Sequence, residues 1–97
     1  MYLEIVSPEA TLFSSKVDSV AVPGVKGEFQ MLKDHASIVS LLGKGNIKIY
    51  VHQQEGFAFD DLHHKILPDE ADKNILTLAI ASGTVEMKDN RVVVLAD

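Results

Sequence analysis

Residues 75–97, ILTLAIASGTVEMKDNRVVVLAD, decide the fold class of this chain. Large apolar residues recur at every second position in 75–80 and 84–87, and residues 92–95 form a continuous apolar run. Period-two alternation is typical of a half-buried strand, and a short apolar run is typical of a strand buried on both faces. Residues 88–91, KDNR, include an Asp-Asn pair that tolerates the positive φ of a tight hairpin turn. This stretch therefore predicts three strands, the last two joined by a hairpin.

The same alternation recurs toward the amino terminus, in residues 2–6, 19–22, 28–31 and 46–51. Residues suited to turns lie between these runs: Pro23, Gly24, Gly27, Gly43 and Gly45. Residues 37–42 fit either one helical turn or a strand, and we favour a short bend or strand. Short strands bounded by turns are typical of an all-β sandwich or barrel, here with about eight to ten strands.

The segment 52–74 departs from this pattern. Leu62 and Ile66 lie four positions apart, as on one face of a helix. Two interpretations stay open for this part of the chain. It forms a short helix near residues 60–67, capped by an aspartate and ended by Pro68, or it is a partly mobile excursion.

The composition excludes several functional classes. No boundary or repeat divides residues 1–97, so we expect a single domain. The net charge of −5 argues against a nucleic-acid binder, because such proteins present a basic face to phosphates. The absence of cysteine excludes a disulfide scaffold and a thiol nucleophile. No apolar run has the length of a membrane helix, and the amino terminus lacks a signal-peptide pattern, so we expect membrane association only through other proteins.

The histidines and carboxylates do not form a predicted metal site. His63 and His64 are neighbours, so their side chains are expected to point about 100° apart on a helix or to opposite faces of a strand. His35 or His52 would join them only if the fold brought them together. The acidic residues of 60–72 lack the alternate-position spacing of a calcium loop. We therefore expect solvated loop residues and no bound cofactor.

No set of residues matches a catalytic site either. Asp34 and His35, with Ser37 or Ser40, are residue types found in hydrolases, but a triad is normally assembled from distant loops. We expect Asp34 to cap a turn and His35 to pack or hydrogen-bond beneath it. Residues 23–28, PGVKGE, lack both the Gly-Lys-Ser/Thr ending and the following helix of a phosphate-binding loop. The residues themselves thus predict a non-catalytic protein.

Several motifs in a fixed order carry a family resemblance: LEIVSPE at 3–9, GEFQMLKDHA at 27–36, SGTVEM at 82–87 and NRVVVLA at 90–96. In this order and spacing, the chain closely resembles the amino-terminal β-sandwich of the epsilon subunit of F-type ATP synthases, which is called delta in mitochondria. The resemblance covers about residues 2–50 and 75–97.

The resemblance implies a flattened sandwich of two sheets at the foot of the rotating central stalk. Such a subunit does no chemistry and carries no cofactor. It binds the gamma subunit, rests on the polar loops of the membrane-embedded c-ring, and helps to couple ion flow to ATP synthesis. Its place is peripheral, on the cytoplasmic side of a bacterial inner membrane or the equivalent face in an organelle. The alternative is a free-standing β-sandwich module that binds a protein or ligand through residues 27–35.

By position, one segment matches the part that the family turns toward the c-ring and gamma: Glu28, Phe29, Gln30, Met31, Leu32, Lys33, Asp34 and His35. The resemblance places Glu28 to meet basic groups of the c-ring loops and His35 to hold the loop near gamma. It also places Ser7 and Ser40 near gamma. Three apolar residues of the segment are expected either in this interface or in the sandwich core: Phe29, Met31 and Leu32.

The chain also departs from the family pattern. Residues 30–33 read Gln-Met-Leu-Lys where the family commonly has Gly-Ile-Leu/Tyr-Pro, and 52–74 is longer than the usual hairpin. Many family members continue into a two-helix carboxy-terminal domain, whereas this sequence stops at Asp97. If this is the natural length, the resemblance implies loss of the helical hairpin, with the braking of ATP hydrolysis and the nucleotide binding attributed to it.

Overall fold

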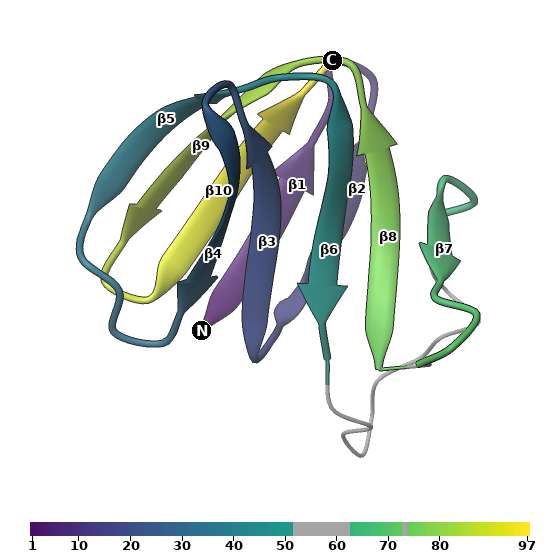
Figure 1. The fold of residues 1–97 in the computed structure, drawn as a ribbon, viewed down its shortest axis with the longest axis horizontal. Helices are drawn as coiled ribbons and strands as arrows, with labels where there is room; N and C mark the ends of the chain where they lie inside the picture. The colour runs from purple at the N-terminus through teal and green to yellow at the C-terminus, as the bar shows by residue number, and fades with distance from the viewer. Residues whose placement is uncertain (52–62, 73) are drawn as a thin grey trace.

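The computed structural model describes residues 1–51, 63–72 and 74–97, and in these residues it contains strands and no helix (Figure 1). The strands are β1 (Tyr2–Val6), β2 (Thr11–Lys16), β3 (Ser19–Gly24), β4 (Gly27–Leu32), β5 (Ile38–Leu42), β6 (Gly45–Tyr50), β7 (Ile66–Pro68), β8 (Ile75–Ile80), β9 (Gly83–Lys88) and β10 (Arg91–Ala96). The all-β prediction is confirmed. The described residues include no helix long and apolar enough to cross a membrane.

The strands form two layers, as predicted for a sandwich (Figure 1). The layer that holds both chain ends, here called the terminal sheet, has the order β2-β1-β10-β9-β5. The other layer, here called the central sheet, has the order β4-β3-β6-β8-β7. β3 and β5 connect the layers through the single pair Gly24–Leu42. Neighbouring strands are antiparallel except β1 and β10, which are parallel.

One apolar core fills the space between the sheets. It is built from alternate residues of the strands, most of which the period-two pattern predicted, and these are almost fully buried: Leu3, Ile5, Val20, Val22, Ile47, Ile49, Leu76, Leu78, Val92 and Val94. Each such side chain contributes about 1.5–3 kcal/mol when it leaves water. The alternation also fixes the register, because a shift by one residue would expose every core side chain of a strand.

The predicted turns lie where the sequence placed them. Asp89 and Asn90, with φ of 53° and 61°, connect β9 to β10, and positive φ at both central residues is the requirement of a type I′ hairpin turn. Gly27, with φ of 129°, follows the turn between β3 and β4. Residues 43–44 connect β5 to β6, and the preference for a bend or strand in 37–42 is confirmed by β5.

The short helix expected near residues 60–67 is not found in the part of that range that is described. Residues 60–62 lie outside the described residues, and 63–65 form a turn that leads into β7. The physical reason is the open edge of β8: Ile66 pairs with Leu78 there and becomes buried. A helix of two turns lacks the length to offset its own nucleation cost.

Candidate interaction surface

The segment predicted to face partners, residues 28–35, forms β4 and the loop after it. β4 lies at the edge of the central sheet and pairs with β3. Its side chains alternate, so they do not share one surface. Met31 is fully buried in the core, Phe29 packs against the core while partly exposed, and Leu32 is exposed. The two alternatives, interface or core, therefore apply to different residues: Met31 lies in the core and Leu32 on the surface.

Glu28 lies near the start of β4, whereas His35 lies beyond its other end. Glu28 follows the turn between β3 and β4, whereas His35 comes after the last residue of β4. A strand rises about 3.3 Å per residue, so Glu28 and Leu32 alone are about 13 Å apart. The structure therefore does not bring the two residues together, and a single contact cannot engage both.

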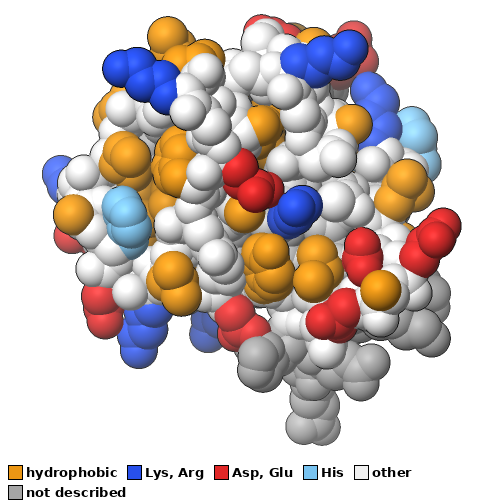
Figure 2. Space-filling view, viewed as in Figure 1, with side chains coloured by type: hydrophobic (Ala, Val, Ile, Leu, Met, Phe, Trp, Pro, Cys, Tyr) orange, Lys and Arg blue, Asp and Glu red, His pale blue; other side chains and the backbone are white. Residues whose placement is uncertain are grey.

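Polar side chains of β4 cover the outer face of the central sheet. The Glu28 carboxylate forms an ion pair with Lys48 Nζ of β6 at 3.4 Å, reaching across β3. Gln30 Nε2 donates a hydrogen bond to the Oγ of buried Ser19 at 2.9 Å. Figure 2, viewed onto this sheet, shows an acidic and a basic side chain next to each other near its middle. An exposed pair of this kind contributes about 0–1 kcal/mol, so Glu28 remains available to a partner.

The loop 33–36 is tied to the hairpin between β9 and β10. Asn90 Oδ1 accepts a hydrogen bond from the backbone N–H of Asp34, and Asn90 Nδ2 donates one to Asp34 Oδ1 at 2.9 Å. Asp34 itself has a φ of 64°. We expected Asp34 to cap a turn, but its carboxylate instead accepts a hydrogen bond from a residue far along the chain. His35 Nδ1 donates to the carbonyl of the next residue, Ala36, at 2.7 Å.

The two serines matched to gamma-facing positions lie on the terminal sheet. Ser7 follows β1, and its hydroxyl both donates to the carbonyl and accepts from the N–H of Ala10, at 3.2 Å in each case. Ser40 lies in β5, and its hydroxyl donates to the Leu41 carbonyl at 3.3 Å. Both hydroxyls are thus satisfied locally. The residues predicted for one interface are distributed over both sheets.

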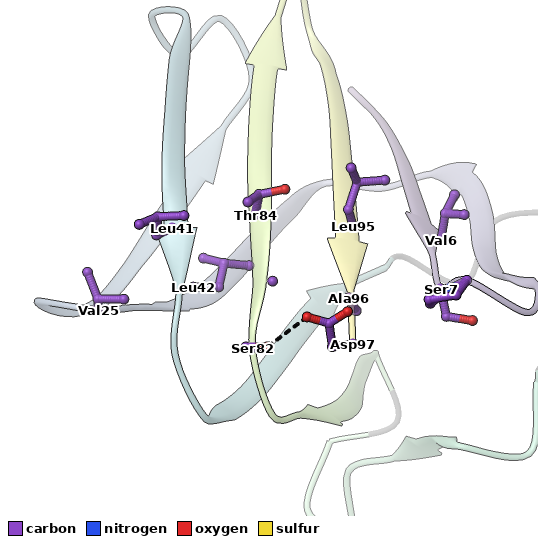
Figure 3. Close-up of a pocket in the computed structure, with 12 residues that line it drawn as sticks. Val6, Ser7, Val25, Leu41, Leu42, Ser82, Thr84, Leu95, Ala96 and Asp97 are labelled. Atoms are coloured by element: carbon purple, nitrogen blue, oxygen red, sulfur yellow. Dashed lines mark hydrogen bonds between the residues drawn. The ribbon is translucent and has the colours of Figure 1, made fainter.

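An apolar pocket of about 590 Å³ lies at the end of the terminal sheet where the chain ends (Figure 3). Its lining comprises Val6, Ser7, Pro8, Val25, Leu41, Leu42, Ser82, Gly83, Thr84, Leu95, Ala96 and Asp97. Ser82 Oγ donates to Asp97 Oδ2 at 2.9 Å, which closes one side. No pattern in the sequence indicates this pocket, although the family resemblance places one of its residues, Ser7, near gamma.

Outward-facing residues of four neighbouring strands line the pocket in a row, and all of them except Thr84 are apolar. Leu41 pairs with Thr84, Thr84 with Leu95, and Leu95 with Val6, so the row runs over β5, β9, β10 and β1 (Figure 3). Leu41 is 63% exposed and Leu95 is 56% exposed. Val39, one position up the outer face of β5, is 76% exposed. These four residues, Val6, Val39, Leu41 and Leu95, are called the apolar row below.

The exposure of Leu95 corrects one prediction. The run 92–95 was expected to be buried on both faces, but only Val92 and Val94, which point into the core, are buried. Leu95 and the half-buried Val93 point outward, where no layer of the described residues covers them. The other end of this face is polar, because the Arg91 guanidinium lies 5.2 Å from the ring centroid of Tyr2. The uncovered apolar area is thus confined to the end near the pocket.

The histidines behave differently from the expectation. The rings of His63 and His64 do not diverge but stack, with centroids 4.3 Å apart, because both lie in a turn and not in a helix or strand. His63 Nδ1 accepts the backbone N–H of Lys65 at 3.2 Å. In the described ranges, no three histidine or acidic side chains converge as metal ligands. His52 lies outside the described residues.

Comparison with known proteins connects this geometry to a family. A family model described as "ATP synthase, Delta/Epsilon chain, beta-sandwich domain" matches residues 1–60. The ATP synthase epsilon chain of Campylobacter curvus is 36% identical over 97 residues, which is all of this chain and 60% of that protein. The epsilon chain of Granulibacter bethesdensis is 37% identical over 95 residues, covering 98% of this chain and 56% of that protein. The chain thus spans about three-fifths of the length of these relatives.

A solved structure shares the fold. It is the cryo-EM structure of the Tetrahymena thermophila mitochondrial ATP synthase, central stalk and c-ring, with a TM-score of 0.66 and 11% identity. The match covers 99% of this chain and 62% of that one. The sequence matches and the shared two-layer fold together give the assignment: this chain belongs to the family of ATP synthase delta/epsilon chains.

Proposed function

We propose that the chain is a non-catalytic rotor subunit of an F-type ATP synthase, which binds the gamma subunit and contacts the c-ring loops to couple ion flow to ATP synthesis. Family membership supports the assignment to an ATP synthase. The solved structure that shares the fold belongs to a central stalk and c-ring assembly. With this role goes a peripheral position at the membrane, on the cytoplasmic side in bacteria or the equivalent face in an organelle.

The apolar row carries the proposal. Exposed apolar side chains that gather on one face of a small protein mark a docking surface, because burying them against a partner removes them from water. Leu41 and Leu95 are more than half exposed, and each gains about 1 kcal/mol or more if a partner covers it. Ser7, which the family resemblance places near gamma, lines the pocket together with Val6 of the row. We therefore assign the gamma subunit to this face.

The c-ring contact is assigned to Glu28 and the turn that precedes it. The carboxylate is exposed, and its ion pair with Lys48 is weak enough to be exchanged for basic groups of a partner. His35 lies beyond the other end of β4, beside the β9–β10 hairpin of the terminal sheet. A gamma subunit lying along the terminal sheet would extend from the pocket toward this loop, so His35 is assigned to gamma and not to the c-ring.

Titration of purified gamma subunit into the chain tests the proposal. We expect a 1:1 complex with an interface larger than about 1,000 Å², the range of stable protein–protein contacts. Absence of any complex, in titration and in co-purification, would contradict the rotor function. A ligand that stabilises the isolated chain in the absence of gamma would instead favour the free-standing binding module.

Glu28→Gln tests the c-ring assignment, with Glu70→Gln as the matched control because Glu70 is also an exposed carboxylate. In a complex rebuilt from the chain, gamma and the c-ring, we expect Glu28→Gln to weaken the association with the c-ring by about threefold at low salt and less at high salt. Glu70→Gln should leave it unchanged. Equal behaviour of the two variants would remove Glu28 from the contact.

A further inference from the structure

The loop 33–36 owes its conformation to a residue far along the chain. In the described residues, the side-chain hydrogen bonds that connect this loop to another element both involve Asn90. The amide oxygen accepts the Asp34 N–H and the amide nitrogen donates to the Asp34 carboxylate, so the two bonds close a ring between residues 56 positions apart. The other bonds of the loop are local, from the His35 N–H to Leu32 and from the His35 ring to Ala36.

Asn90 is itself held rigidly. It is the second central residue of the β9–β10 turn, with φ of 61°, a region that asparagine occupies more readily than most residues. Its carbonyl accepts the N–H of Tyr2 at 2.9 Å, which fixes the turn to β1. The side chain of Asn90 is therefore presented to Asp34 from a hairpin fixed on both sides.

The ring with Asn90 also fixes the backbone of Asp34. Aspartate adopts a φ of 64° more readily than most residues but less readily than a negative φ, so contacts that hold this conformation help to set the loop. The ring with Asn90 supplies both an acceptor for the Asp34 N–H and a donor for its carboxylate. An asparagine can supply both, whereas an aspartate at position 90 would offer acceptors only and face the Asp34 carboxylate.

We propose that Asn90 is a positioning residue, which sets the loop 33–36 in the conformation that presents Lys33 and His35 to the gamma subunit. The partner named here rests on the proposed function. The positioning itself rests on the ring of hydrogen bonds between the two residues and on the positive φ at each.

Four variants separate positioning from a general structural role. Asn90→Gly keeps a residue that accepts positive φ but removes the ring, and Asn90→Asp replaces the donor by an acceptor. Asp34→Asn combined with Asn90→Asp exchanges the two side chains, so the amide and the carboxylate meet again with their places reversed. Asp89→Gly is the matched control, since Asp89 occupies the same turn at φ 53° and its side chain makes no hydrogen bond or ion pair in the described residues.

Two measurements are made on each variant: hydrogen exchange of the Asp34 amide in the chain alone, and affinity for purified gamma subunit. We expect exchange to become about tenfold faster in Asn90→Gly and Asn90→Asp, as for loss of a net hydrogen bond or two. We expect gamma affinity to fall about fivefold in the same variants. The exchanged pair should restore both quantities, and Asp89→Gly should change neither.

Each other outcome contradicts the inference. Unchanged exchange in Asn90→Gly, which removes the acceptor of the Asp34 N–H, would show that the ring does not set the loop. Faster exchange with unchanged affinity would remove the loop from the gamma contact. Failure of the exchanged pair to recover, or an equal effect of Asp89→Gly, would assign the effect to the turn as a whole. If the unaltered chain binds no gamma, the proposed function fails, while the exchange measurement still decides whether Asn90 positions the loop.

Discussion

The outer faces of the two sheets differ in the side chains that cover them. On the central sheet, outward-facing Ala21 lies between Gln30 and Lys48 of the neighbouring strands and is buried, and Gln30 also covers Ser19. On the terminal sheet, the apolar row remains open to solvent around the pocket. Polar side chains thus cover the middle of one outer face, whereas the other keeps exposed apolar side chains at the end near the pocket. Under the proposed function, gamma covers this apolar end, because exposed apolar side chains on one face are typical of a docking surface.

The largest expected change in stability is the difference between a core substitution and a substitution on an outer face. Leu76→Ala removes a fully buried side chain from the core and should lower the free energy of unfolding by about 2–5 kcal/mol, through lost burial and the cavity left behind. Leu95→Ala removes an exposed side chain and should change it by about 0.5 kcal/mol or less. Urea denaturation of both variants checks this. A large loss in Leu95→Ala would mean that the row supports the fold instead of a partner.

The next largest change in stability is expected at Gly83, which lies against the backbone of Leu95. A Cβ added at Gly83 would lie 2.4 Å from the backbone oxygen of Leu95, so β9 and β10 would have to move apart. We expect Gly83→Ala to destabilise the chain by about 1–3 kcal/mol. At Gly43 the nearest atom would be 3.9 Å away, so Gly43→Ala should fall within about 0.5 kcal/mol of the unaltered chain. Thermal denaturation of the two variants measures this difference in stability. Equal stabilities would show that β9 and β10 adjust to the added methyl group without cost.

A smaller effect tests the polar cover of the central sheet. Gln30→Ala leaves the hydroxyl of buried Ser19 without its donor and should cost about 1 kcal/mol of stability. Adding Ser19→Ala to it should recover part of this loss, because both partners of the bond are then absent. Denaturation of the single and double variants measures the coupling. Strict additivity would show that the bond does not stabilise this face.

The smallest effect is that of the ion pair on the same face. Lys48→Met removes the cation beside Glu28 and should change stability by about 0–1 kcal/mol at low salt, and by less at high salt because both groups are exposed. Denaturation at two ionic strengths provides the measurement. A loss that does not depend on salt would indicate that the Lys48 stem, and not its charge, covers the sheet.

The strands that the sequence predicted and those that it missed differ in one physical respect. Where large apolar residues alternate with other residues in the sequence, as in β8 and β9, the period of two predicted the strand, and the apolar run 92–95 predicted β10. In β2 the adjacent residues Leu12 and Phe13 are both buried, because the pairing with β1 shifts register between Ile5 and Val6. Such a bulge breaks the period of two, and β2 was not predicted from it. The three-residue β7 is too short to show a period.

The candidate site was less predictable than the fold. Local alternation identifies the two faces of a strand but not whether a further layer covers the outer one, so the apolar run 92–95 was expected to be buried on both faces. The Asp34–Asn90 ring was not foreseen, because it joins two loops that only the folded topology brings together. Resemblance to a family placed Ser7 near gamma, and only the folded structure shows that Ser7 lines a pocket.

The central claim is that gamma docks on the apolar row of the terminal sheet, and its most direct test is the affinity of a row variant for purified gamma subunit. The variant is Leu41→Asp with Leu95→Asp, and the control is Leu67→Asp in β7, where the leucine is similarly exposed, at 61%. With both variants folded by circular dichroism, we expect the row variant to lose about a hundredfold in affinity, as for two residues central to an interface. The control should stay within about threefold of the unaltered chain. Equal affinities of the row variant and the control would contradict the assignment of gamma to this face.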